Sequence, residues 1–400
     1  MPLSRKTAPL LGLALLPFVL GLAARPAQAQ LYTLTILGSA SSSGNAVNNM
    51  GQVAGVAAFN GVYHAFLSGA SGGMLKDLGT LPGNEAFSVG IGVNNAGQVA
   101  GQSSSNTNGF ISHAFLSGPN GGPLKDLGTF GGTFGTGNAV NDTGQVTGNA
   151  ALAGNGTGHA FLSGPNGGSL KDLGTLPGDT GSSGAGVNAA GQVAGSSVNA
   201  DGTINHAFLS AANGGTLKDL GTLRGFDNSL SNAVNSTGQV TGVAFNFADQ
   251  SVARAFLSGA NGGPLQDLGT IGGFVQSIGD SVNAAGQVAG YCSNADSSIS
   301  SAFLFSNGVM TDLNSLIAPG SGFTLDTANG ISDTGFITGV ATDANGVSYA
   351  YLLTPQAPVP EASTTLSFGL LLALGMGGVV LTLRKKRILN GERRVDNHRA

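Results

Sequence analysis

The stretch HAFLSGPNGGPLKDLGT, residues 113–129, recurs in imperfect copies along most of the chain. Successive copies begin 49, 46, 47, 48, 47 and 48 residues apart, and a second motif, VNxxGQVxG, precedes each of them. A period of this length predicts an array of small supersecondary units, none of which can bury its apolar face alone. The copies begin at His64, His113, His159, His206, Arg254, Ser301 and Tyr349, and the preceding motifs at Val47, Val93, Val140, Val187, Val234, Val282 and Ile331.

One repeat, residues 86–130, predicts four short strands. We expect the first to end at Val93, the second to span 98–102, the third 113–117 and the fourth 124–129. The Asn- and Gly-rich clusters between them are typical of tight turns and hairpins. Four antiparallel strands in each repeat of about 47 residues indicate the blade of a β-propeller.

Polar residues recur on the third and fourth strands at a spacing of 13 residues. If each hairpin is centred on its Gly-rich loop, these residues face each other and add ~0.2–1 kcal/mol per pair, mainly to register. Ser301 and Asp312 keep the same relation across a shorter loop. A metal site built from the repeated histidines is the disfavoured alternative, because equivalent positions in separate blades lie far apart. The predicted structural pairs are His64–Asp77, His113–Asp126, His159–Asp172, His206–Asp219 and Arg254–Asp267.

The strand count predicts how the array closes. The second- and third-strand motifs occur seven times, but the fourth-strand motif occurs six times, from Asp77 to Asp312. Residues 34–39, LTILGS, align with the missing copy, with Ile36 in the place of Asp and Tyr349 in the place of His. An open array would need a capping unit at each end. We therefore expect residues 30–354 to form an all-β, seven-bladed β-propeller closed by its N-terminal strand.

Both ends of the chain carry export and membrane signals. Residues 1–29 read as a signal peptide, with a basic start, an apolar run over 10–22 and a small-residue cleavage site that leaves Gln30 first in the mature chain. Near the other end, 22 uncharged residues precede a basic cluster. As a helix they would span roughly 33 Å, enough to cross a bilayer core of about 30 Å. The expected order is a linker at 355–362, a transmembrane helix at 363–383 and a cytoplasmic tail at 384–400.

Composition limits the chemistry of the exported part. Residues 30–362 hold six Lys and Arg against 18 Asp and Glu, a net charge of about −12, so no nucleic-acid partner is expected. Glycine supplies 68 of 400 residues, which favours turns over helices. The single cysteine, Cys292, excludes an intramolecular disulfide and a cysteine metal cluster, and we expect a buried, inert thiol.

The repeats offer no catalytic motif. The sequence lacks a G-x-S-x-G elbow, an H-E-x-x-H pair and a phosphate loop, so we assign no catalytic residue, metal or cofactor. The segment 343–346, DANG, is expected to be a hairpin turn rather than a piece of a calcium loop. The loops between second and third strands vary most, so a partner is expected on the face where they gather. The motif asparagines are expected to satisfy turn amides: Asn48, Asn94, Asn141, Asn188, Asn235 and Asn283.

Two resemblances add to these expectations. Residues 33–353, with HAFLSG, LKDLGT and VNxxGQVxG, resemble the HAF-repeat family of probable extracellular repeat proteins, which implies export but no catalytic residues. Residues 358–387 resemble the PEP-CTERM sorting signal, although Ala362 stands where that signal has its second proline. This resemblance implies processing by an exosortase-like enzyme. The matching residues are Val359, Pro360, Glu361, Arg384, Lys385, Lys386 and Arg387.

Together these patterns predict a surface-anchored, non-enzymatic module that binds or scaffolds the extracellular matrix or exopolysaccharide. Signal peptidase and an exosortase-like enzyme are its expected processing partners, and an extracellular polysaccharide or surface protein its expected ligand. Two alternatives remain open at this point: a propeller lyase or hydrolase acting on polysaccharide, and a purely structural adhesin.

Overall fold

The computed structural model describes residues 31–83, 86–105 and 111–356. The predicted signal peptide (1–29), the sorting box, the transmembrane helix (363–383) and the basic tail (384–400) lie outside the described residues. In the part of the chain that is described, no helix is both long enough and apolar enough to cross a membrane.

The described strands follow the predicted period. A first strand, β1 (Tyr32–Leu37), precedes groups of four. These are β2 (Ser43–Val47), β3 (Val53–Phe59), β4 (Val62–Ser68) and β5 (Leu75–Asp77); β6 (Phe87–Val93), β7 (Val99–Ser105), β8 (Ile111–Ser117) and β9 (Leu124–Gly128); β10 (Gly131–Val140), β11 (Val146–Leu152), β12 (Gly158–Ser163) and β13 (Leu170–Asp172).

The later groups are β14 (Gly181–Val187), β15 (Val193–Val198), β16 (Asn205–Ser210) and β17 (Leu217–Gly221); β18 (Asn228–Val234), β19 (Val240–Phe245), β20 (Ala253–Ser258) and β21 (Leu265–Asp267); β22 (Gln276–Val282), β23 (Val288–Ser293), β24 (Ser300–Ser306) and β25 (Val309–Asp312). The last strands are β26 (Phe323–Ile331), β27 (Ile337–Asp343) and β28 (Ser348–Pro355). Two short 3₁₀ turns, η1 (Ala70–Gly72) and η2 (Leu313–Leu316), complete the described elements.

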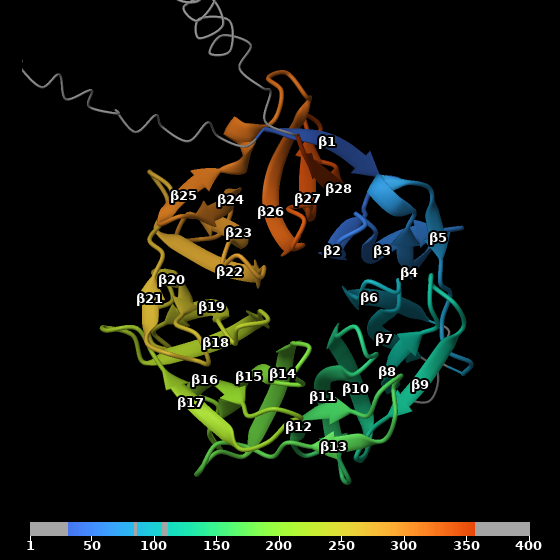
Figure 1. Cartoon of the computed structure of the whole chain (residues 1–400), viewed down its shortest axis with the longest axis vertical. Coiled ribbons are helices and arrows are strands. Elements are labelled where there is room, and N and C mark those ends of the chain that lie inside the picture. The colour runs from blue at the N-terminus through green and yellow to red at the C-terminus, as the bar shows by residue number, and fades with distance from the viewer. Residues whose placement is uncertain (1–30, 84–85, 106–110, 357–400) are drawn as a thin grey trace, which may run out of the picture.

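The strands build a ring of antiparallel four-stranded units around a central channel (Figure 1). Three units are separate sheets, and the other four units join in pairs as two eight-stranded sheets. Each join is a single parallel bridge, Phe134 to Ser112 in one and Ala253 to Gln276 in the other. This arrangement confirms the all-β propeller architecture that the repeat predicts.

The N-terminal strand joins the two ends of the ring, as the strand count predicts. β1 pairs antiparallel with β28, from Tyr32 opposite Pro355 to Leu37 opposite Ala350, in a sheet of order β1-β28-β27-β26. β28 continues through Pro355, the first residue of the predicted linker. The seam is apolar, because Tyr32 and Leu37 are buried and Ile36 packs against the cluster that contains Tyr32.

The HAF motif supplies the core between neighbouring units. Its aromatic residue, phenylalanine in six copies and tyrosine in the seventh, is fully buried and packs on the preceding unit. Phe115, for example, belongs to a cluster that includes Ala65 and Leu67 of the unit before it. Alternation along the strand thus gives each sheet an apolar cover on both faces. The residues at this position are Phe66, Phe115, Phe161, Phe208, Phe256, Phe303 and Tyr351.

The last glycine of VNxxGQVxG is required by close packing of backbones. A Cβ added at Gly195 would lie 2.2 Å from the Ser183 carbonyl oxygen and 2.4 Å from the ring of Phe208. The equivalent glycines have the same surroundings, for example Gly101 at 2.0 Å from the Val89 carbonyl. This glycine therefore lets the first and second strands approach the buried phenylalanine.

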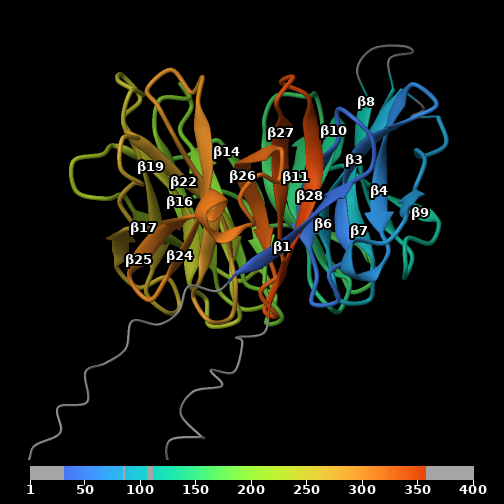
Figure 2. The same cartoon turned by 90° about the horizontal axis from the view of Figure 1, so that it is seen from above.

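The ring has two distinct faces. The hairpin loops between second and third strands, such as 199–204 and 246–252, lie on one of them, which we call the loop face. The VNxxGQ turns and the Gly-rich loops lie on the opposite face, which we call the turn face; Figure 2 shows the ring from its side. Both described chain ends lie on the turn face, where Gln356 N donates to Leu31 O at 2.9 Å.

Candidate functional site

The central channel is a polar space to which all seven repeats contribute. A ring of valine and isoleucine side chains, one from the end of each inner strand, divides it into two chambers. The chamber that opens at the turn face has a volume of about 230 Å³, and we call it the upper chamber. The chamber on the loop-face side of the valine ring has a volume of about 200 Å³, and we call it the lower chamber, so these names run opposite to the view of Figure 2. The dividing residues are Val47, Val93, Val140, Val187, Val234, Val282 and Ile331.

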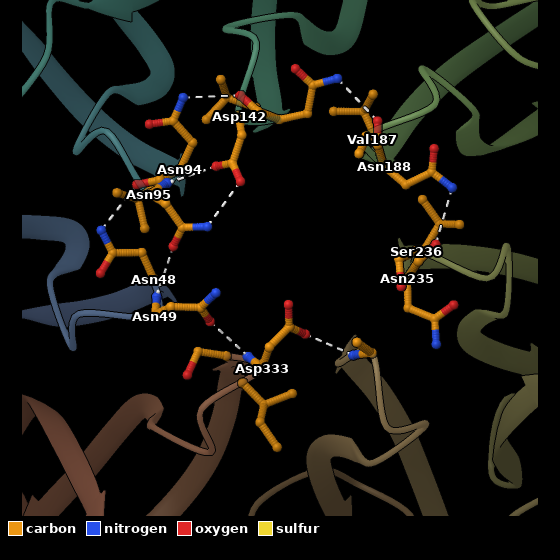
Figure 3. Close-up of a pocket in the computed structure, with 18 of the residues that line it drawn as sticks. Asn48, Asn49, Asn94, Asn95, Asp142, Val187, Asn188, Asn235, Ser236 and Asp333 are labelled. Atoms are coloured by element: carbon orange, nitrogen blue, oxygen red, sulfur yellow. Dashed lines mark hydrogen bonds between the residues drawn. The ribbon is translucent and has the colours of Figure 1, made fainter.

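The motif asparagines surround the upper chamber, and each side chain both accepts hydrogen bonds within its own turn and donates one to the next unit. The Oδ1 atom of Asn94 accepts hydrogen bonds from the amides of Ala96 and Gln98, as predicted for a turn asparagine. Its Nδ2 donates at 2.9 Å to the carbonyl of Asn141 in the next unit. The same bond recurs from Asn48 to Asn94 (Figure 3) and so on through Asn283 to Ser332.

The bonds between units were not predicted from the sequence. Repetition of VN marks the position, but only the ring brings Asn94 beside a carbonyl 47 residues away. The seventh repeat departs from the pattern, because Ser332 replaces Asn. There Thr334 Oγ1 donates to Asn49 O, and Asn49 Oδ1 accepts from the amide of Asp333, so a different set of contacts joins the ends.

The residues after these asparagines form the rim of the upper chamber. Asn95 accepts from the amide of Asn49 at 3.0 Å, and Asp142 accepts from both the amide and the side chain of Asn95 at 2.9 Å. Asp333 accepts from the amide of Ala284 at 2.7 Å. Each carboxylate at the rim therefore links adjacent units, as the dashed lines of Figure 3 show.

The lower chamber is lined by residues at β-bulges. Each inner strand has a register shift near its C-terminal end, and the residue left unpaired there lines the chamber. Four of these residues are asparagines whose Nδ2 donates to a carbonyl of the next unit. The bonds are Asn45 to Gly90 (2.8 Å), Asn138 to Gly184 (2.8 Å), Asn232 to Gly279 (3.1 Å) and Asn329 to Gly44 (2.9 Å).

Asp280 occupies one bulge and breaks this pattern. Its Oδ2 atom is buried without a hydrogen-bond partner, although the residue as a whole is half-buried. Its Oδ1 atom has one long contact, 3.4 Å, to Asn232 Nδ2. Burial raises the pKa of Asp280 to about 8. Sequence reasoning missed this residue, because its special environment arises from a bulge that local patterns do not reveal.

The predicted His–Asp pairs form hydrogen bonds on the outer side of the ring. Nδ1 lies 3.0 Å from an Asp oxygen in His64–Asp77, His159–Asp172 and His206–Asp219, and 2.7 Å in His113–Asp126. The register differs from the expectation of directly facing residues. Asp77 lies opposite Phe66, and His64 reaches it diagonally from two residues away.

The fifth pair, Arg254 and Asp267, does not form an ion pair in the described structure. Arg254 donates to the carbonyls of Ala253 and Val275, because its longer side chain reaches the strand that follows. Asp267 accepts from the amide of Gly269. In the sixth copy, Ser301 Oγ donates to Asp312 Oδ1 at 3.0 Å.

The remaining candidate positions are structural in their contacts. Cys292 is buried, which raises its pKa to about 11, so the thiolate needed for reactivity is scarce at neutral pH. Asp343 accepts from the amides of Asn345 and Val347, the contacts of a hairpin turn. Among the described residues, no group of three or more His, Cys, Asp or Glu side chains could hold a metal ion.

Solved structures share the architecture at low sequence identity. No protein-family model matches the chain, and no curated protein is detectably similar. A prolyl endopeptidase aligns with a TM-score of 0.50 at 11% identity over 82% of this chain and 51% of its own. The propeller domain of the Trilobed protease from Pyrococcus furiosus gives 0.49 at 9% identity over 83% of this chain and 100% of its own.

TolB from Acinetobacter baumannii aligns with a TM-score of 0.42 at 13% identity over 80% of this chain and 65% of its own. The chain therefore spans about half the length of the prolyl endopeptidase and just under two thirds of TolB. At such identities a likeness concerns the fold alone.

Proposed function

We propose that the protein is an exported, surface-anchored propeller of seven blades whose loop face binds components of the extracellular matrix or exopolysaccharide. The blade count takes each four-stranded unit as one blade, with each eight-stranded sheet counted as two. The observation that carries the proposal is the separation of faces: the variable loops lie opposite the two described chain ends. A tether at the C-terminal end would therefore leave the loop face open to partners.

The loop face has the chemistry of a binding surface. Several large apolar side chains are exposed there, including Tyr63, Ile204, Phe247 and Ile299, the last at 62%. Aspartates stand among them, and hydrogen bonds from neighbouring side chains and amides lower the pKa of Asp201, Asp249 and Asp296. Such carboxylates stay ionised in mildly acidic surroundings, so the face suits a neutral or cationic partner better than an anionic polymer.

Export and sorting belong to the same proposal. Signal peptidase would remove residues 1–29, and an exosortase-like enzyme would act near Val359-Pro360-Glu361. Non-enzymatic binding is favoured over polysaccharide cleavage because the titratable side chains that line the two described chambers, Asp142, Asp333 and Asp280, come from separate blades and share no hydrogen bond. An assay for release of reducing or unsaturated ends from the host polysaccharide tests the enzyme alternative.

Shortening the loops is expected to weaken partner binding at least tenfold. Loops 199–204, 246–252 and 294–299 would each be replaced by Asn-Gly, the two-residue turn that Asn60-Gly61 already provides in this fold. We expect at least a tenfold loss in co-sedimentation with the host's extracellular matrix, because the replacement removes the exposed apolar and acidic side chains that these loops carry.

The matched control exchanges two six-residue loops of the turn face, 164–169 and 211–216, which occupy equivalent positions. It should bind like the natural chain. Equal binding by the loop-shortened protein would show that partners do not use the loop face.

A further inference from the structure

The bulge positions of the lower chamber identify one residue whose chemistry does not match its place. Four bulge asparagines each donate a hydrogen bond to a carbonyl of the next blade. Ile91 and Ala185 occupy two further bulges and have no polar side-chain group. Asp280 occupies the one remaining bulge, and its ionised carboxylate cannot donate a hydrogen bond. The contacts of its carboxylate are one long approach, 3.4 Å from Asn232 Nδ2 to Asp280 Oδ1, and a buried Oδ2 without a donor.

A buried carboxylate oxygen without a hydrogen-bond donor needs a proton or a cation beside it. Asp280 Oδ2 has neither a hydrogen-bond donor nor solvent access in the described structure. Asp280 is also the only titratable side chain among the residues that line the lower chamber. From the adjacent strand, Tyr291 is the titratable group affected by it: burial first, and then the charge of Asp280, raise the pKa of Tyr291.

The asparagines on either side supply further oxygen atoms. Asn232 and Asn329 donate their amide protons to neighbouring carbonyls, and among the described contacts their Oδ1 atoms have no partner. The two more distant asparagines differ, because Asn45 Oδ1 accepts from Ser43 and Asn138 Oδ1 accepts from Thr136. The unused oxygen atoms therefore belong to the blades that flank Asp280.

We propose that the lower chamber binds a calcium ion, with the Asp280 carboxylate as its only charged ligand and the side-chain oxygens of Asn232 and Asn329 as neutral ones. Carboxylate and amide oxygens are the ligands that Ca²⁺ prefers. With a single negative charge the site belongs to the weak class, with a dissociation constant on the order of 10⁻⁴–10⁻³ M, typical of extracellular modules.

Asp280→Asn is the decisive variant. Four equivalent bulges already carry Asn, so the variant is expected to fold, with its new side-chain amide able to donate to the next blade. At pH 9, where the natural carboxyl is ionised, 5 mM Ca²⁺ should raise the melting temperature of the natural protein by about 2–4 °C. The variant should show no such rise. At pH 6 the natural protein should respond little, because the carboxyl retains its proton.

A second readout reports the ion itself. Terbium(III) bound at Asp280 should luminesce when tyrosine is excited, since Tyr291 lies close and the chain has no tryptophan. We expect the signal to disappear in Asp280→Asn and to persist in Asp249→Asn, which removes an exposed loop carboxylate instead. An equal calcium response in Asp280→Asn, or no response of the natural protein at pH 9, would overturn the proposal in favour of a permanently protonated Asp280 or of ions held by the loops.

Without calcium, the stability of the natural protein relative to Asp280→Asn should fall as pH rises. The folded Asp280 carboxyl has a pKa of about 8 against an ordinary value of 3.8, so the folded state holds a proton that the unfolded state releases. The loss should begin near pH 4 and level off above pH 8. Urea titrations between pH 5 and 9 measure it, and a constant difference across that range would contradict the assigned environment of Asp280.

Discussion

A chain that lacks residues 31–37 is expected to lose cooperative folding of the ring. This segment supplies all of β1, whose removal would leave β28 as an open edge and expose the core around Tyr32 and Leu37. Burial of each large apolar side chain contributes about 1.5–3 kcal/mol, so the loss is on the order of 5 kcal/mol, comparable with the whole stability of many domains. Circular dichroism and urea unfolding of the truncated chain and of its full-length counterpart measure the effect.

The control removes a seam contact without removing the strand. Ile36→Asp restores the residue that the other blades have at this position, and should destabilise the ring less than the deletion does. Adding Tyr349→His recreates the usual polar pair and should recover part of the loss in a double-mutant cycle. An unchanged unfolding midpoint after deletion of 31–37 would mean that the ring does not depend on this closure.

Gly195→Ala is expected to cost at least 3 kcal/mol or to prevent folding. The added Cβ would lie 2.2 Å from the Ser183 carbonyl and 2.4 Å from the buried ring of Phe208, neither of which can move without disturbing an adjacent blade. Overpacking in a filled core typically costs 1–3 kcal/mol, and a contact with backbone leaves less room to relax. Thermal unfolding of the purified variant gives the measurement.

Gly156→Ala serves as the matched substitution, because no atom lies within 4 Å of the Cβ it would add. We expect its unfolding midpoint to change little. Equal midpoints for the two variants would show that the inner strands can separate to admit a methyl group, and would argue against the tight approach described above.

The sequence predicted the features that repeat. Period, turn chemistry and alternation of apolar residues were sufficient for a four-stranded unit, and the missing fourth-strand copy pointed to β1. The spacing of 13 residues also predicted the correct His–Asp hydrogen-bonded pairs in four copies, although Asp77 lies opposite Phe66 rather than His64 in the ladder. The offset arises at the hairpin loop, because Ser68 pairs with Leu75 and the loop is therefore centred one residue later than a direct pairing of His64 with Asp77 requires.

The features that the sequence could not predict arise between blades. The Asn94 side chain looks like a simple turn residue until the ring places Asn141 beside it. Bulges shift register by one residue at positions such as Asn138, and nothing in the local pattern marks them. In the sequence, nothing distinguishes Asp280 from the other acidic residues, and its burial without a partner is visible only in the structure. Likewise, Arg254 is a plausible partner for Asp267 in the sequence, but in the structure it donates to the carbonyl of Val275 instead.

The most direct test of the central proposal, an exported propeller that displays its loop face, is cysteine labelling on intact cells of the native host. Cys292 is buried, so a new cysteine at the exposed Ala200 on the loop face would react with little background. We predict that a membrane-impermeant maleimide labels Ala200→Cys on intact cells, and labels Ser169→Cys on the turn face more slowly if the tether holds that face near the membrane. Labelling of Ala200→Cys only after the cells are lysed would contradict export and the function built on it.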